Sequence, residues 1–160
     1  MRTMTPLPRE FQDLLRSFNA QELRYLLVGG WAVGRHGYKR YTGDIDFWIA
    51  ASPENADRLI SALMKFIGVA PRKESITEGR KTVEFGNPPL KVHIMCDISG
   101  VEFDKCYRNR VETDWDGIVV PVIGLEDLLK NKSSTGRLKD KADVSSLKKR
   151  HQKRKRKKKK

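Results

Sequence analysis

Two acidic residues, Asp44 and Asp46, stand one residue apart in the segment that carries most of the chemical information in this sequence. They open an apolar run that is typical of a buried strand. Because side chains alternate between the faces of a strand, both carboxylates are expected on one face. Two neighbouring carboxylates repel each other unless a cation lies between them. The spacing therefore predicts a cation site on this face.

Two consecutive glycines, Gly29 and Gly30, end the preceding apolar run and begin a short predicted helix. A glycine turn at the start of a helix exposes backbone N–H groups that can hold a phosphate. A phosphate seat beside a metal-binding pair of carboxylates indicates nucleotide chemistry. The alternatives are a tight turn without a ligand for the glycines, and an acidic turn paired with Lys39 or Arg40 for the carboxylates.

The size and composition of the chain restrict its class. Its 160 residues favour one domain with a true hydrophobic core. No apolar run approaches the roughly 20 residues of a membrane-spanning helix, and the first ten residues lack the apolar stretch of a secretory signal. The two cysteines, Cys96 and Cys106, form no CxxC pair. These features predict a cytoplasmic protein without a membrane partner or a disulfide framework.

The net charge of +13 is concentrated at one end of the chain. Residues 148–160 contain 11 lysines and arginines and no acid, which leaves +2 for the rest. Self-repulsion of these charges predicts a disordered basic tail over 148–160 that follows a domain over 1–147. Such a tail can bind nucleic acid by neutralising phosphates, or it can be a solvated segment without a partner.

Hydrophobic spacing predicts that helices and strands are interspersed along the chain. Helices are expected over 8–19, 31–36, 103–110, 125–130 and 139–149, and another is expected to begin at Ser52-Pro53. Strands are expected over 24–28, 45–50, 81–85, 90–96 and 118–123, the last at a sheet edge because Pro121 lacks an N–H. Phe47 and Trp48 are expected in the core. The fold class is α/β (α+β), with a small mixed sheet covered by helices.

These motifs resemble a known family. The sequence GGWAV, followed by HG and by RYTGDID, is similar to the GG…DxD signature of the polymerase-β-like nucleotidyltransferase superfamily. The nearest likeness is to its small bacterial members, the minimal nucleotidyltransferases and their relatives in toxin–antitoxin and abortive-infection systems. The segments PPLKVHIMCDISG and GLEDLLKNKSSTGRLKD continue the resemblance, which extends over residues 25–147.

The resemblance implies a role for each matching residue. Asp44 and Asp46 would hold Mg²⁺ against the triphosphate, and a nucleoside monophosphate would be transferred while pyrophosphate leaves. The residues implied in nucleotide binding are Gly29, Gly30, Arg40, Thr42, Lys132, Arg137 and Lys139, with Asp140 and Asp143 orienting the last three. The alternatives are local backbone support for Thr42 and ordinary ion pairs for the closing segment. His36 is expected to finish its helix structurally.

The sequence departs from the family at the third carboxylate, because His93 stands where related strands carry an acid. Asp97 lies on the same strand face but about 13 Å further along, so both cannot serve one site in a straight strand. Three interpretations follow. His93 is the base or a nitrogen ligand, which would shift the preference from Mg²⁺ toward Mn²⁺. Alternatively, Asp97 supplies the metal-binding carboxylate, or the third position is lost.

Three functions are consistent with these observations, the third of which is binding of nucleic acid through the basic tail alone. The first is a metal-dependent nucleotidyltransferase that moves a nucleoside monophosphate from a nucleoside triphosphate to a protein, RNA or small-molecule acceptor. The second is a catalytically weak module with the same fold that acts as an antitoxin-like or regulatory partner. The glycines and the carboxylate pair favour the first function, whereas His93 favours the second.

Overall fold

The computed structural model describes residues 6–38, 43–79 and 82–158. The helices are α1 (Arg9–Ala20), α2 (Gly29–Arg35), α3 (Pro53–Ile67), α4 (Lys73–Thr77), α5 (Phe103–Arg108), α6 (Leu125–Ser134) and α7 (Leu138–Lys158). The strands are β1 (Tyr25–Val28), β2 (Asp44–Ile49), β3 (Val83–Phe85), β4 (Lys91–Met95), β5 (Val111–Trp115) and β6 (Ile118–Val122). No helix in these ranges is long and apolar enough to cross a membrane.

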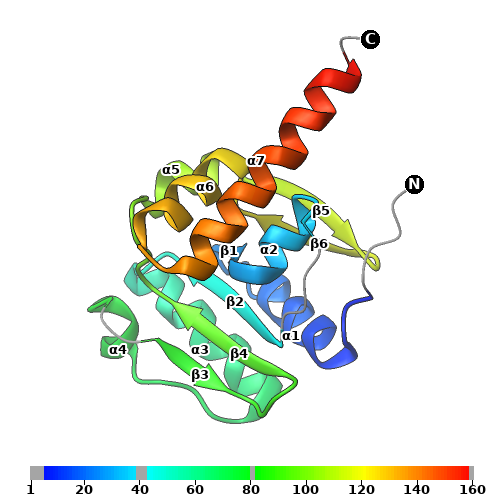
Figure 1. The fold of residues 1–160 in the computed structure, drawn as a ribbon. Helices are drawn as coiled ribbons and strands as arrows, with labels where there is room; N and C mark the ends of the chain where they lie inside the picture. Colours follow the sequence, from blue (N-terminus) through cyan, green and yellow to red (C-terminus); the bar gives the residue numbers. More distant parts are fainter. Residues whose placement is uncertain (1–5, 39–42, 80–81, 159–160) are drawn as a thin grey trace.

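The strands form one mixed sheet in the order β3-β4-β2-β1-β6-β5 (Figure 1). The neighbours β2 and β4 run parallel, as do β1 and β6, while the remaining pairs are antiparallel. The predicted mixed sheet with covering helices is confirmed. Its centre, β1 and β2, carries the two segments that the sequence identifies as chemically important.

The core forms around β1 and β2. Phe18, Tyr25 and Phe47 meet edge to face, with ring centroids 5.1 to 5.7 Å apart. Such aromatic packing adds to the area buried and fixes α1 against the sheet. Phe47 and Trp48 are buried, as predicted. The core therefore covers both faces of the end of β2, because Phe47 and Trp48 point to opposite faces, while Asp44 and Asp46 lie in its first half.

Local signals explain where α3 begins and ends. Ser52 caps the helix, since its hydroxyl accepts a hydrogen bond from the N–H of Asn55 at 3.2 Å, and Pro53 occupies the first turn. Gly68 ends the helix in the left-handed conformation, with φ 76°. The predicted start of this helix is confirmed.

One strand is missing from the sequence prediction, and another is misplaced by it. β5 forms a hairpin with β6 across the turn residues Asp116 and Gly117, which have φ of 52° and 83°. An Asp-Gly pair between apolar runs is a strong hairpin signal that the prediction overlooked. The edge position predicted for β6 is wrong, because β5 covers that side. Pro121 is tolerated since the hydrogen bond to β1 comes from the N–H of Ile123.

The basic segment also differs from its prediction. The predicted disorder over 148–160 is not what the structure describes, because α7 continues as one helix to Lys158 and extends beyond the domain (Figure 1). Lysine and arginine are good helix formers. The helix is already nucleated where Leu147, 1% exposed, packs on the core, so each added residue gains a backbone hydrogen bond at little cost.

Candidate active site

Three neighbouring strands bring the acidic pair and His93 together. In the β2–β4 pairing, Asp46 lies opposite His93, and in the β3–β4 pairing His93 lies opposite Glu84. These three residues therefore form one row across the sheet, and Asp44 lies two residues earlier on the same face. The side chain of Asp46 is 23% exposed and that of Asp44 is 45% exposed. The prediction that the two carboxylates share a face is consistent with this row.

The imidazole of His93 lies among three carboxylates. Its Nδ1 is 3.2 Å from Asp46 Oδ1, and its Nε2 is 3.7 Å from Asp44 Oδ2 and 3.8 Å from Glu84 Oε1. Nε2 is buried and makes no hydrogen bond within the described part of the chain. His93 thus stands beside the acidic pair, at the position where the resemblance expects a third acid.

Neighbouring groups act in opposite directions on the pKa of the Asp46 carboxyl group. Burial raises the pKa of its carboxyl group, and the charge of Asp44 raises it further. His93, Lys132 and Lys139 act in the opposite direction. Because the sum still raises the pKa, the ionised carboxylate is not fully compensated by these neighbours. A further cation at this point would lower the pKa and stabilise the ionised form.

The lack of a side chain at Gly29 leaves the space that the Asp46 carboxylate occupies. A Cβ atom built on Gly29 would overlap the Asp46 carboxylate, and Gly29 has a φ of 66° that other residues rarely adopt. Helix α2 begins at this glycine, and no side chain caps its first N–H groups. The close approach therefore explains the first glycine, and it places the start of α2 directly against Asp46.

Replacing Gly29 by alanine is expected to displace the Asp46 carboxylate and to destabilise the fold by about 1–2 kcal/mol, since the new Cβ meets both overlap and a left-handed backbone. Gly34→Ala is the matched control in the same helix, because a Cβ there meets nothing within 4 Å. Chemical denaturation should show the control equal to or more stable than the unchanged protein. Equal stability of the two variants would contradict this role for Gly29.

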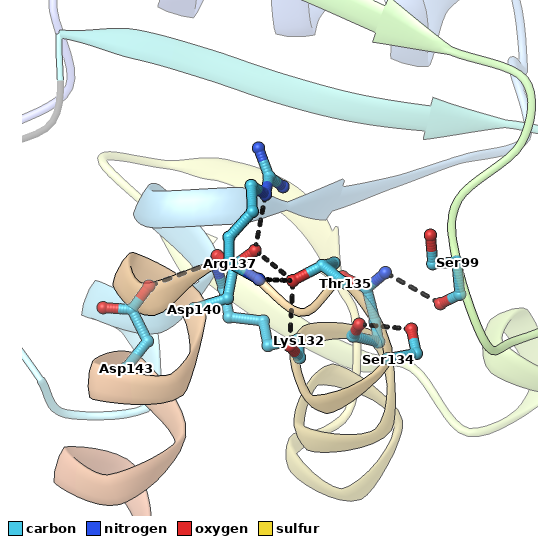
Figure 2. A network of polar contacts seen from close by, with 8 residues as sticks. Ser99, Lys132, Ser134, Thr135, Arg137, Asp140 and Asp143 are labelled. Atoms are coloured by element: carbon cyan, nitrogen blue, oxygen red, sulfur yellow. Dashed lines mark hydrogen bonds and ion pairs between the residues drawn. The ribbon is translucent and has the colours of Figure 1, made fainter.

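A second polar cluster is formed by residues of α6, α7 and the loop between them (Figure 2). Lys132 of α6 is almost fully buried, and its Nζ lies 2.9 Å from Asp140 Oδ1 and 3.1 Å from Asp143 Oδ2 on α7. Both carboxylates are also buried. The family resemblance implies that these aspartates orient the basic residues, and the two short distances agree with that role for Lys132.

The other oxygen of Asp140 organises the loop between α6 and α7. Asp140 Oδ2 accepts hydrogen bonds from the Thr135 hydroxyl at 2.6 Å and from Arg137 Nε at 2.9 Å (Figure 2). Burial alone would raise the pKa of Asp140, but the hydrogen bonds and charges of Thr135, Lys132 and Arg137 hold it below its usual value. Asp140 is therefore an anion that fixes two cations, while the Arg137 side chain stays 75% exposed.

One cavity of about 320 Å³ joins the two clusters. Its wall includes nine residues named in the sequence analysis: Gly29, Gly30, Asp46, His93, Asp97, Lys132, Arg137, Lys139 and Asp140. It also includes Ser99, Asn131 and Thr135, which the sequence analysis did not identify. Thr135 was detectable, because it lies inside the segment between Lys132 and Arg137. The cavity offers a cationic wall facing an acidic row, a combination suited to a phosphate ligand that carries a metal.

Other predicted residues lie elsewhere. Asp44 shares the face of Asp46 but does not line the cavity, and Arg40 and Thr42 lie outside the described residues. His36 has a structural role, as predicted, since its Nε2 is 2.7 Å from the carbonyl oxygen of Ile123. Burial lowers the pKa of His36, which favours the neutral ring.

The carboxylate oxygens of Asp44 and Asp46 suit a hard cation that is also bound by substrate oxygens. Within the described residues no three His, Cys, Asp or Glu side chains come together as a complete metal site. Asp97 follows the end of β4 at Met95 and lines the same cavity as Asp46, and its predicted role as a metal ligand stays a prediction. Mg²⁺ is commonly bound by one or two carboxylates together with substrate phosphates, so Asp44 and Asp46 fit this cation without a third protein ligand.

No protein-family model matches the sequence, and no curated protein sequence matches it significantly. Solved structures do share its fold. A protein of Thermotoga maritima described as a nucleotidyltransferase is 15% identical, with a TM-score of 0.52 over 94% of this chain and 97% of that one. The lincosamide antibiotic adenylyltransferase LnuA, solved with lincomycin bound, is 19% identical, with a TM-score of 0.53 over 89% and 97%.

A nucleotidyltransferase-like protein of Paracoccidioides brasiliensis is 17% identical, with a TM-score of 0.51 over 84% of this chain and 71% of that one. The three neighbours are named for the same activity, although each shares less than a fifth of its residues with this chain. These likenesses establish that the chain has the nucleotidyltransferase fold.

Proposed function

We propose that the chain is a metal-dependent nucleotidyltransferase that transfers a nucleoside monophosphate from a nucleoside triphosphate to a protein, RNA or small-molecule acceptor. The observation that carries this proposal is one cavity lined by Asp46, by Gly29 and Gly30 at the start of α2, and by the cations Lys132, Arg137 and Lys139. A cavity that contains both a carboxylate and several cations fits a metal–triphosphate complex. The fold of the neighbours supports the same reaction class.

The triphosphate would lie between the start of α2 and the basic wall. Gly29 and Gly30 carry uncapped N–H groups that can donate to phosphate oxygens. Arg137, held by Asp140 through Nε only, keeps its other guanidinium nitrogens without an ion pair within the described residues. Lys139 makes no ion pair there either. These two side chains are the donors that the protein leaves available for phosphate.

Asp44 and Asp46 would hold Mg²⁺ or Mn²⁺, which neutralises charge that develops on the triphosphate. The acceptor hydroxyl attacks the α-phosphorus, the bond from this phosphorus to the β-phosphate oxygen breaks, and pyrophosphate leaves. We assign His93 as the base that takes the proton of the hydroxyl, because it lines the cavity beside Asp46. The family resemblance also implies a nucleotide-binding role for Arg40 and Thr42, which lie outside the described residues.

The resemblance further suggests the small bacterial group associated with toxin–antitoxin and abortive-infection systems. The support is the sequence of the segments around His93 and between Lys132 and Asp140. In such a setting the acceptor is a macromolecule. LnuA, by its name, adenylylates a lincosamide antibiotic, which is a small molecule, so a small-molecule acceptor stays within the proposal.

The reaction is tested with nucleoside triphosphates labelled at the α- or the γ-phosphate. The protein is incubated with metal and with cell extract that supplies RNA, proteins and small molecules. We expect acceptor label from the α-phosphate only, together with metal-dependent release of pyrophosphate. Label from the γ-phosphate would identify a kinase instead and would contradict the proposal.

One observation favours the second function, a catalytically weak partner protein with this fold. His93 Nε2 is buried beside Asp44 and Glu84, an arrangement that also suits a ring that orders the acids without taking a proton. His93→Asp, which restores an all-oxygen donor set, separates the two functions. A gain of Mg²⁺-dependent transfer from an inactive starting protein would support the weak module, whereas a loss of transfer would support His93 as a working residue.

A further inference from the structure

One face of α7 is lined by cations at helical spacing. The residues Ser146, Lys149, Arg150, Lys153, Arg154 and Lys157 recur every three or four positions, which places them on a single side of the helix. Together with Tyr38, which follows α2, they line a second open cavity of about 400 Å³. We call the five cations in this set the basic face of α7.

The basic face carries charge that nothing in the described structure compensates. None of its five cations forms an ion pair with a described residue, and the sequence contains no acid after Asp143. Each of the five residues is exposed. The cations recur every 5–6 Å along the helix axis by the ordinary rise of about 1.5 Å per residue. A row of unpaired, evenly spaced cations favours a ligand with a repeating negative charge.

Tyr38 adds an aromatic group to this row. It is half-buried and packs against the hydrophobic core, so its backbone and ring are anchored by the domain. An anchored aromatic side chain beside a cationic groove is the usual arrangement for single-stranded nucleic acid, in which cations hold phosphates and the ring stacks on a base. An acidic peptide would use the cations but not the ring, and a duplex keeps its bases stacked away from it.

We propose that the basic face of α7 and Tyr38 bind single-stranded nucleic acid, with phosphates along the helix and a base on the Tyr38 ring. This inference goes beyond nucleotidyl transfer and does not depend on it, because the cavity that carries it contains none of the residues of the candidate active site. Binding is measured in the absence of nucleoside triphosphate and metal, so its failure leaves the proposed reaction untouched.

The test compares two pairs of substitutions with the same charge change. Lys149→Gln/Lys153→Gln removes two cations from the basic face, and Lys148→Gln/Lys155→Gln removes two from the opposite face of the same helix. All four side chains are exposed, so neither pair perturbs packing. Anisotropy of a fluorescein-labelled single-stranded RNA of about 12 nucleotides is recorded over a range of salt concentrations. Single-stranded DNA, duplex DNA and polyglutamate serve as comparison ligands.

We expect the first pair to weaken RNA binding and to reduce the slope of log affinity against log salt by about 1.4, the value for two lost phosphate contacts on a single strand. The second pair should leave both quantities unchanged. Tyr38→Leu should weaken binding at least about fivefold without changing the slope, and Tyr38→Phe should retain it. RNA and DNA single strands are both expected to bind.

Three outcomes would overturn the inference. The first is an equal loss of affinity in both pairs, which would mean that net charge alone attracts the RNA. The second is binding of polyglutamate with the affinity of RNA and the same dependence on the basic face, which would identify an acidic peptide site. The third is tighter binding of duplex DNA than of single strands.

Discussion

Replacing Asp46 by asparagine is expected to lower the rate of nucleotidyl transfer about 10³-fold, the upper range for loss of one group that stabilises transition-state charge. The amide has the shape of the carboxylate but no charge, so it holds the metal–triphosphate complex poorly. The fold should survive, because asparagine matches the size of aspartate and removes a partly buried charge, whose burial raises the pKa of Asp46. The rate is measured as pyrophosphate release at saturating nucleotide.

Asp13→Asn is the matched control for this change. Asp13 lies on α1, is half exposed and, among the described residues, pairs on the surface with Arg16 at 3.3 Å. Such a pair contributes little to stability, and the control should retain both fold and rate. A rate for Asp46→Asn within threefold of the control would contradict the assignment of the acidic row to the reaction.

Replacing Lys132 by methionine is expected to destabilise the protein by about 3–5 kcal/mol, the usual cost of removing one partner from a buried ion pair. Methionine fills a similar volume, so the loss comes from charge and not from a cavity. The variant leaves Asp140 and Asp143 buried without their shared cation, and the α6–α7 loop loses its anchor. The free energy of unfolding is obtained from urea denaturation.

Comparison with Arg137→Met separates the effect of removing a buried cation from the effect of removing an exposed one. Arg137 contacts the same carboxylate as Lys132, but its side chain is 75% exposed, so its loss should cost less than about 1 kcal/mol. We expect it to weaken triphosphate binding instead, since Arg137 lines the cavity. Equal destabilisation by the two variants would show that Lys132 is not the organising residue of this cluster.

Local sequence signals predicted most of the elements that position the site. The apolar spacing of α1, the Ser52-Pro53 start of α3 and the glycines that begin α2 each depend on residues close together in the sequence. The alternation along β2 predicted the shared face of Asp44 and Asp46 for the same reason. Such features follow from short-range sterics and hydrogen bonding, which a single sequence displays directly.

The pairing of strands that are far apart in the sequence could not be predicted from such local signals. The contact of His93 with Asp46 depends on the parallel register of β2 and β4, whose strands are more than 40 residues apart. The sequence showed that His93 replaces the expected third acid, but it did not predict that His93 lies close to three carboxylates. Glu84 was missed because β3 reaches the site only through its pairing with β4.

The segment from Lys132 to the end of α7 was predicted in part. The spacing of Lys132, Arg137, Asp140 and Asp143 indicated a basic cluster with orienting acids, and the structure brings Lys132 and both acids into one buried network. The helical state of the basic end was not predicted, because charge repulsion was weighed above helix propensity. The one-sided arrangement of its cations becomes visible only once the segment is helical.

The most direct test of the central claim is calorimetric titration of the protein with ATP, GTP, CTP and UTP, each with Mg²⁺ and with Mn²⁺. The same titrations are made on the variant Asp44→Ala/Asp46→Ala. A nucleotidyltransferase site predicts metal-dependent binding of at least one nucleotide by the unchanged protein and loss of that binding in the variant. Binding of no nucleotide, or binding that the variant retains, would contradict the assignment of the cavity between β2 and α7 as a nucleotide site.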